Sequence, residues 1–117
     1  MESLPDLCRV SDILLDVDVD CKNQLFAYAA RQLGQRHALN SQTVQSALQL
    51  REQTGSTALG HGLALPHARI PGLSEAHALF LRLKRDMEFD SPDGKPVRSL
   101  LLLLLPQEAH PQHLQLL

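Results

Sequence analysis

Residues 90–106 read DSPDGKPVRSLLLLLLP and hold the strongest structural signal in the chain. Asp93-Gly94 is a strong turn signal, so we expect a strand on each side of it. The leucine run 100–105 is far shorter than the roughly 20 apolar residues that span a bilayer. We therefore interpret it as a buried strand, and the alternation in 78–84 (ALFLRLK) predicts its partner.

Apolar residues upstream recur at helical spacing and predict two helices. The first follows a short strand over 13–19, is capped by Asp20 and runs to about Arg36. The second is capped by Ser41 and stops near Thr54-Gly55. Strands interspersed with helices, together with one hairpin, predict a single α/β domain with a mixed sheet. The positions expected to face the core are Leu25, Phe26, Ala29, Ala30, Leu33, Val44, Ala47 and Leu48.

Composition limits the possible partners. Aromatic residues make up 3 % of the 117, the net charge is −2, and no basic run is present, so nucleic acid is not an expected partner. The two cysteines, Cys8 and Cys21, form neither a disulfide framework nor a metal motif. The acidic N-terminus lacks the features of a signal peptide. We expect a cytoplasmic protein without membrane insertion.

The stretch GSTALGHGLALPHARI, residues 55–70, is the candidate functional segment. His67 follows Pro66, and a neutral imidazole is a good nucleophile toward an activated phosphoryl group. Backbone amides freed by glycine turns and neighbouring hydroxyls can bind an anion. The expected rim consists of Ser56, Thr57, Gly60, His61 and Gly62. The alternative is that His67 is an ordinary solvated or structural loop residue.

Arg51 falls on the inner face of the second predicted helix, at the end nearest this segment. Its planar guanidinium could neutralise a phosphoryl group at His67, or it could simply complement the helix dipole. A zinc site built from His61, His67 and His77 matches no standard ligand spacing. No metal and no other cofactor is expected.

Four stretches together resemble one known family. They are SDILLDVDV (11–19), REQTGSTALGHGLALPHARI (51–70), FDSPDGKPV (89–97) and PQEAHPQHLQLL (106–117). The chain is similar to the fructose/mannitol-type (type-2) IIA domains of the bacterial phosphoenolpyruvate:sugar phosphotransferase system (PTS). The segments LPHARIPGL and FDSPDGKPV are most similar to the nitrogen-regulatory branch, whose members are not fused to a membrane transporter.

This resemblance implies a mixed sheet of about five strands with helices on both faces. It implies that His67 is phosphorylated, that Arg51 assists at the phosphoryl group, and that His113 is a second active-site imidazole. The donor would be an HPr-like phosphocarrier. Ala58 departs from the family pattern, which has glycine there, so one loop torsion is expected to differ.

Three functions from different classes follow. The first is a regulatory phosphocarrier whose phosphohistidine changes which proteins it binds. The second is a IIA domain of sugar uptake that passes the phosphoryl group to a IIB domain. The third is a binding module without the chemistry. The chain ends inside a helix expected after Pro111, so we expect residues 1–117 to be a IIA domain cut at its C-terminus.

Overall fold

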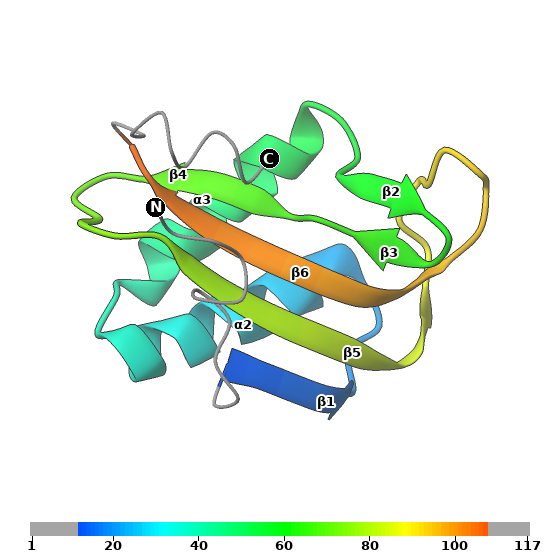
Figure 1. Cartoon of the computed structure of the whole chain (residues 1–117), viewed down its shortest axis with the longest axis horizontal. Helices are drawn as coiled ribbons and strands as arrows, with labels where there is room; N and C mark the ends of the chain where they lie inside the picture. The colour runs from blue at the N-terminus through cyan, green and yellow to red at the C-terminus, as the bar shows by residue number, and fades with distance from the viewer. Residues whose placement is uncertain (1–11, 108–117) are drawn as a thin grey trace.

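The computed structural model describes residues 12–107, which form one mixed sheet and two helices (Figure 1). The strands are β1 (Ile13–Val17), β2 (Ala58–Gly60), β3 (Leu63–Ala64), β4 (His67–Ile70), β5 (His77–Met87) and β6 (Val97–Pro106). The helices are α2 (Lys22–His37) and α3 (Ser41–Gln53). The α/β class is confirmed, with six strands rather than about five.

β6 is the centre of the sheet, whose order is β1-β5-β6-β3-β2, with β4 pairing β6 beyond β3. β5 and β6 are antiparallel, joined by a turn in which the amide of Gly94 donates to the carbonyl of Ser91 (3.0 Å). β3 and β4 run parallel to β6, and β1 runs parallel to β5. The predicted hairpin and the predicted buried leucine strand are therefore both confirmed.

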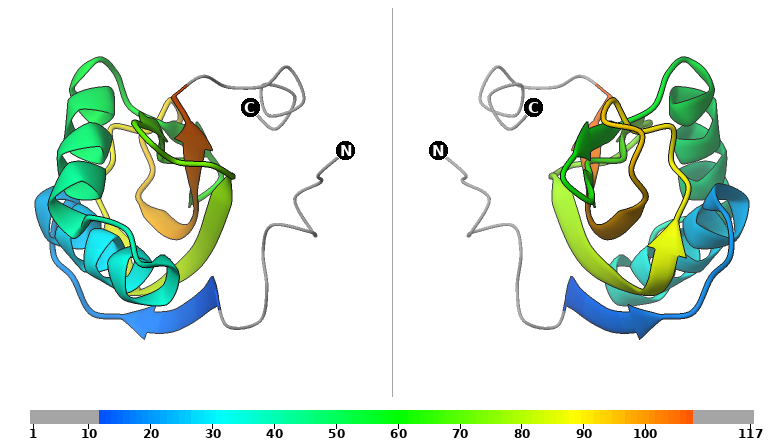
Figure 2. Two further views of the ribbon diagram at one scale, coloured as in Figure 1. Left: turned by 90° about the vertical axis from the view of Figure 1, so that its left-hand side faces the viewer. Right: turned by 90° about the vertical axis from the view of Figure 1, so that its right-hand side faces the viewer.

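Both helices cover the same face of the sheet (Figure 2). Their apolar side chains bury against alternate residues of β5 and β6, among them Leu79, Leu81, Leu102 and Leu104. Seven of the eight predicted core positions are buried, and Ala47 is half-buried. The helix expected after Pro111 lies outside the described residues, so cover on the second face stays a prediction. Neither described helix is long and apolar enough to cross a membrane.

The helix caps differ from the predicted ones by one residue. Cys21 is the N-cap of α2 and makes no side-chain cap bond, whereas Asp20 pairs with Arg85 at 2.6 Å. Asn40, not Ser41, caps α3, and its side chain accepts from the amide of Thr43 (3.0 Å). At both sites several polar residues stand in a row, and the turn geometry selects among them.

Candidate functional site

His67 is the first residue of β4. It lies opposite Leu103 of β6, and the amide of Leu103 donates to the carbonyl of Pro66 (2.9 Å). The imidazole is half-buried, with Nδ1 2.9 Å from the carbonyl oxygen of Leu65. A carbonyl oxygen can only accept, so Nδ1 carries the hydrogen and Nε2 keeps a free lone pair.

A pocket of about 460 Å³ opens beside His67, at the edge where α3 passes β4. Arg51 lines the same pocket, so the structure brings the two predicted residues together. Arg69 also lines it, two residues along the strand from His67 and therefore on the same side of β4. The full lining is Ala47, Leu50, Arg51, His67, Ala68, Arg69 and Leu105. Among the described residues of this lining, two are arginines and none is a carboxylate, so this part of the pocket is electropositive.

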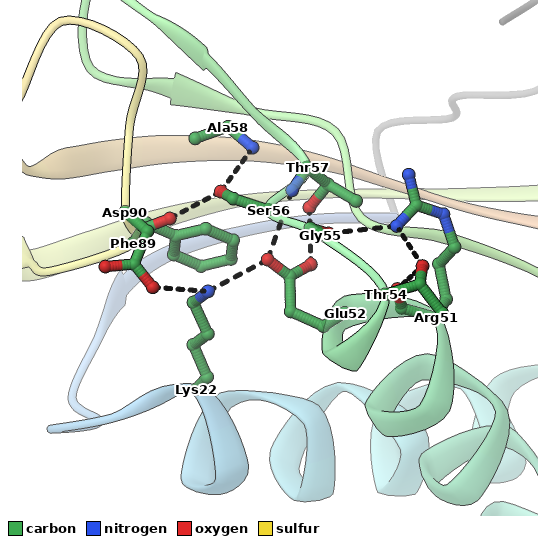
Figure 3. Close-up of polar contacts among 10 residues, drawn as sticks. All are labelled: Lys22, Arg51, Glu52, Thr54, Gly55, Ser56, Thr57, Ala58, Phe89 and Asp90. Atoms are coloured by element: carbon green, nitrogen blue, oxygen red, sulfur yellow. Dashed lines mark hydrogen bonds and ion pairs between the residues drawn. The ribbon is translucent and has the colours of Figure 1, made fainter.

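Arg51 lies in the last turn of α3, where a cation complements the helix dipole. Its Nη1 donates to the carbonyl of Gly55 (2.9 Å) and to the hydroxyl of Thr54 (3.2 Å) (Figure 3). A guanidinium has five N–H donors, and these bonds use only those of Nη1. The donors on Nε and Nη2 bond no other described residue, so Arg51 is both anchored and able to bind an anion.

Ser56 and Thr57 do not line this pocket, and their hydroxyls bond to other residues (Figure 3). Ser56 Oγ donates to the carbonyl of Phe89, and Thr57 Oγ1 donates to Glu52 Oε1 at 2.7 Å. Each hydroxyl has a single hydrogen, so neither can donate to a phosphoryl group while these bonds persist. The expected rim therefore falls into two parts. The first part, Ser56 and Thr57, holds its own loop in place through these bonds.

In the second part, Gly60 ends β2 and His61 and Gly62 form the turn to β3, and none of the three lines the pocket. All three have positive φ, 93°, 57° and 77°. The amide of His61 donates to Asp93 Oδ2 at 2.9 Å, which ties this turn to the β5–β6 turn. The His61 side chain is exposed.

Hydrogen bonds from the amides of His61 and Lys95 hold the pKa of the Asp93 carboxyl below its usual value of 3.8. A carboxyl whose pKa is lower in the folded state than in the unfolded state stabilises the fold at any pH above its unfolded pKa. This stabilisation is lost as the pH falls through the folded pKa. Asp93→Asn should therefore melt below the parent at pH 7, and the gap should close as the pH drops below 3.8. Thermal melts of both proteins from pH 7 to below 3.8 measure this difference in melting temperature. A difference that does not change with pH would show that the effect comes from the shape of the side chain and not from its charge.

The remaining predicted residues are placed as follows. Ala58 has no positive φ and forms part of β2, so alanine replaces the family glycine there without backbone strain. His77 stacks on His37, with ring centroids 4.1 Å apart. Among residues 12–107, no cluster of three histidine, cysteine or acidic side chains is arranged to hold a metal ion. His113 lies outside the described residues.

Sequence reasoning missed Glu52 as a functional candidate. Its carboxylate lies 2.9 Å from Lys22 Nζ and accepts from both the amide and the hydroxyl of Thr57, while its side chain is only 6 % exposed. A signal was present, since a carboxylate in the last turn of a helix opposes the dipole and needs compensating partners. Those partners come from α2 and from residue 57.

Comparisons with known proteins identify the family of this chain. The family model of the phosphoenolpyruvate-dependent sugar phosphotransferase system, EIIA 2, matches residues 6–117. A nitrogen regulatory protein of Bradyrhizobium diazoefficiens is 37 % identical over 114 residues, which cover 97 % of this chain and 74 % of that protein. One from Pseudomonas aeruginosa is 38 % identical over 94 residues, or 80 % of this chain and 59 % of that protein.

The crystal structure of the nitrogen regulatory protein IIA-Ntr from Neisseria meningitidis superimposes with a TM-score of 0.85 at 40 % identity, over 92 % of this chain and 73 % of that one. The chain thus spans between about three fifths and three quarters of the length of these relatives. PTS IIA domains are phosphotransfer proteins. The chain belongs to the EIIA type-2 family of the phosphotransferase system and is similar to its nitrogen regulatory members.

Proposed function

We propose that this chain is a phosphocarrier that accepts a phosphoryl group on Nε2 of His67 from an HPr-like phosphocarrier. The observation that carries the proposal is the shared pocket of about 460 Å³, which places His67 and Arg51 on one apolar-walled surface. Membership of the EIIA type-2 family supports the choice of an HPr-like phosphocarrier as the phosphoryl donor. An exposed free Cys21 fits the cytoplasm, where thiols stay reduced.

The transfer step follows from the tautomer of His67. Because Nδ1 donates to the carbonyl of Leu65, the lone pair of Nε2 is the available nucleophile. The bond from Nε2 to phosphorus forms as the bond from phosphorus to the donor imidazole breaks, and that imidazole keeps the electron pair. Nδ1 retains its hydrogen throughout, so the bond to Leu65 also orients the phosphorylated ring.

Arg51 supplies charge at the developing transition state. Phosphoryl transfer needs little covalent help from the protein and depends on positioning and on cations near the equatorial oxygens. Nη1 is fixed on Gly55, and the donors of Nε and Nη2 are available for those oxygens. We further propose, from the family pattern, that His113 brings a second imidazole to the phosphoryl group.

The proposal extends to signalling. Phosphorylation adds about −1.5 to −2 charge near neutral pH. The same pocket is lined by Leu50, a residue that is 63 % exposed. A partner that covers this leucine would have to desolvate the new charge, which costs several kcal/mol if the charge stays unpaired. A regulated partner therefore binds the unphosphorylated form and leaves when His67 is modified.

Pull-down from lysate with defined forms of the protein tests this proposal. We expect the unphosphorylated protein and His67→Ala to retain a common partner, identified by mass spectrometry. The phosphorylated protein and His67→Glu, an imperfect charge mimic, should retain it more weakly, by about tenfold or more. Leu50→Ser should weaken the complex without preventing phosphorylation.

A different result would assign the chain to sugar uptake. If no protein distinguishes the two states, and a IIB domain efficiently accepts the phosphoryl group from phospho-His67, the signalling proposal is wrong. The phosphocarrier role would then stand with a IIB domain as its acceptor. A protein that neither accepts nor passes on a phosphoryl group would leave the binding-module interpretation.

A further inference from the structure

Glu52 lies at the centre of a cluster of hydrogen-bonded polar side chains near the pocket, although it does not line the pocket itself. Its Oε2 accepts from Lys22 Nζ (2.9 Å) and from the amide of Thr57 (3.1 Å), and its Oε1 accepts from Thr57 Oγ1 (2.7 Å) (Figure 3). A buried carboxylate is costly unless it is paired and hydrogen-bonded, as here. The cluster joins α2, the end of α3 and residue 57.

Lys22 is held in turn by the segment after β5. Its Nζ lies 4.4 Å from the ring centroid of Phe89, in a cation–π arrangement, and 3.9 Å from Asp90 Oδ2. The carbonyl of Phe89 accepts from Ser56 Oγ, one residue before Thr57. The partners of Glu52 are therefore themselves fixed, so the carboxylate has little freedom to move.

A chain of hydrogen bonds leads from Glu52 to the imidazole of His67. The carbonyl of Thr57 accepts from the amide of Leu65 at 2.9 Å. The carbonyl of that same Leu65 accepts from Nδ1 of His67, also at 2.9 Å. The Thr57 carbonyl thus holds the Ala64–Leu65 peptide, and the carbonyl of the next peptide, Leu65–Pro66, determines which imidazole nitrogen carries the hydrogen.

The same cluster restrains the loop that Arg51 binds. Arg51 precedes Glu52 in α3 and donates to the carbonyl of Gly55, while Glu52 binds Thr57 two residues further on. Residues 55–57 are consequently held at both ends by adjacent side chains of a single helical turn. A displacement of Glu52 would disturb the anchor of Arg51 as well as the partner of His67.

We infer that Glu52 is a positioning residue for phosphoryl transfer, acting through Thr57 and Leu65 on the tautomer of His67. This inference rests on the proposed transfer to His67. Glu52 fixes Thr57, the Thr57 carbonyl holds the amide of Leu65, and the carbonyl of Leu65 keeps Nε2 free to attack. Misplacement of a reacting group by about 1 Å can cost about a hundredfold in rate.

The test compares Glu52→Gln and Thr57→Val with the conservative Thr57→Ser. The measurements are the rate of phosphoryl transfer from a charged HPr-like phosphocarrier and the nitrogen-15 chemical shifts of the His67 ring, which report its tautomer. Glu52→Gln and Thr57→Val should slow transfer by about tenfold to a hundredfold and reduce the Nδ1–H population. Thr57→Ser keeps the hydroxyl and should stay near the parent rate.

Leu33→Ala, in the core of α2, is the control for a merely structural effect, because it lowers stability far from this chain of bonds. It should leave the tautomer and the rate near those of the parent. Unchanged rates and ring shifts in both Glu52→Gln and Thr57→Val would overturn the inference, as would an equal rate loss in Leu33→Ala. If the parent itself accepts no phosphoryl group on His67, the proposed function fails as well, and this result is distinct from the other two.

Discussion

His67→Ala is expected to lose phosphoryl acceptance entirely while it folds almost as well as the parent. The variant removes the only nucleophile among the described residues that line the pocket. The backbone bonds that hold β4 to β6 do not involve the imidazole, and the side chain is only half-buried. Intact-mass spectrometry after incubation with a charged HPr-like phosphocarrier should show one added phosphoryl group on the parent and none on the variant.

His61→Asn is the matched control for this experiment. His61 is exposed, does not line the pocket, and has a φ of 57°, a conformation that asparagine tolerates better than alanine. We expect it to be labelled like the parent. Labelling of His67→Ala at normal stoichiometry would show that another residue accepts the phosphoryl group. Loss of labelling in His61→Asn would return His61 to the site, where the sequence interpretation put it.

The fold was largely predictable because burial leaves a period in the sequence. Five apolar residues of α2 recur at helical spacing, and all five are buried on its inner face: Leu25, Phe26, Ala29, Ala30 and Leu33. The uninterrupted run of leucines and the Asp93-Gly94 turn predict β6 and its hairpin with β5. These signals are local, so they do not depend on knowing which segments meet.

β4 was not predictable from such signals. Its four residues, His67 to Ile70, follow a proline and are too few to establish an alternation. They become a strand because they pair in parallel with residues 103–106 of β6, a contact between segments far apart in the chain. This pairing matters for the proposed function, because a strand holds the imidazole of His67 more firmly than a loop does.

The rim residues show a second limit of sequence reasoning. Glycines and hydroxyls in one segment are typical of an anion-binding loop, and residues 55–62 fit that description. Which way Ser56 and Thr57 point depends on acceptors from elsewhere, the carbonyl of Phe89 and the carboxylate of Glu52. Composition indicates that a segment is rich in donors, but it does not show where those donors are directed.

Arg51→Ala should slow phosphoryl transfer by about a hundredfold to a thousandfold, the usual effect of removing one preorganised donor from a developing charge. The loss should appear in the maximal transfer rate more than in the concentration of donor that half-saturates it, because the guanidinium is proposed to bind the transition state. Arg51→Lys should recover only part of the rate, since an ammonium restores the charge but not the planar fork. Rapid-quench transfer assays measure all three proteins.

Stability must be measured on the same samples, because Arg51 also holds Gly55 and Thr54. Losing these partly exposed bonds should cost about 1 kcal/mol of unfolding free energy, too little to explain a large change in rate. Arg69→Ala removes the second arginine of the described pocket lining, which bonds no described residue. It tests whether any positive charge near His67 is enough to support transfer. Because Arg69 lacks the anchor that aims Arg51, its loss should slow transfer by less than tenfold. A strongly destabilised Arg51→Ala that still transfers at the parent rate would make Arg51 a structural residue of the helix end.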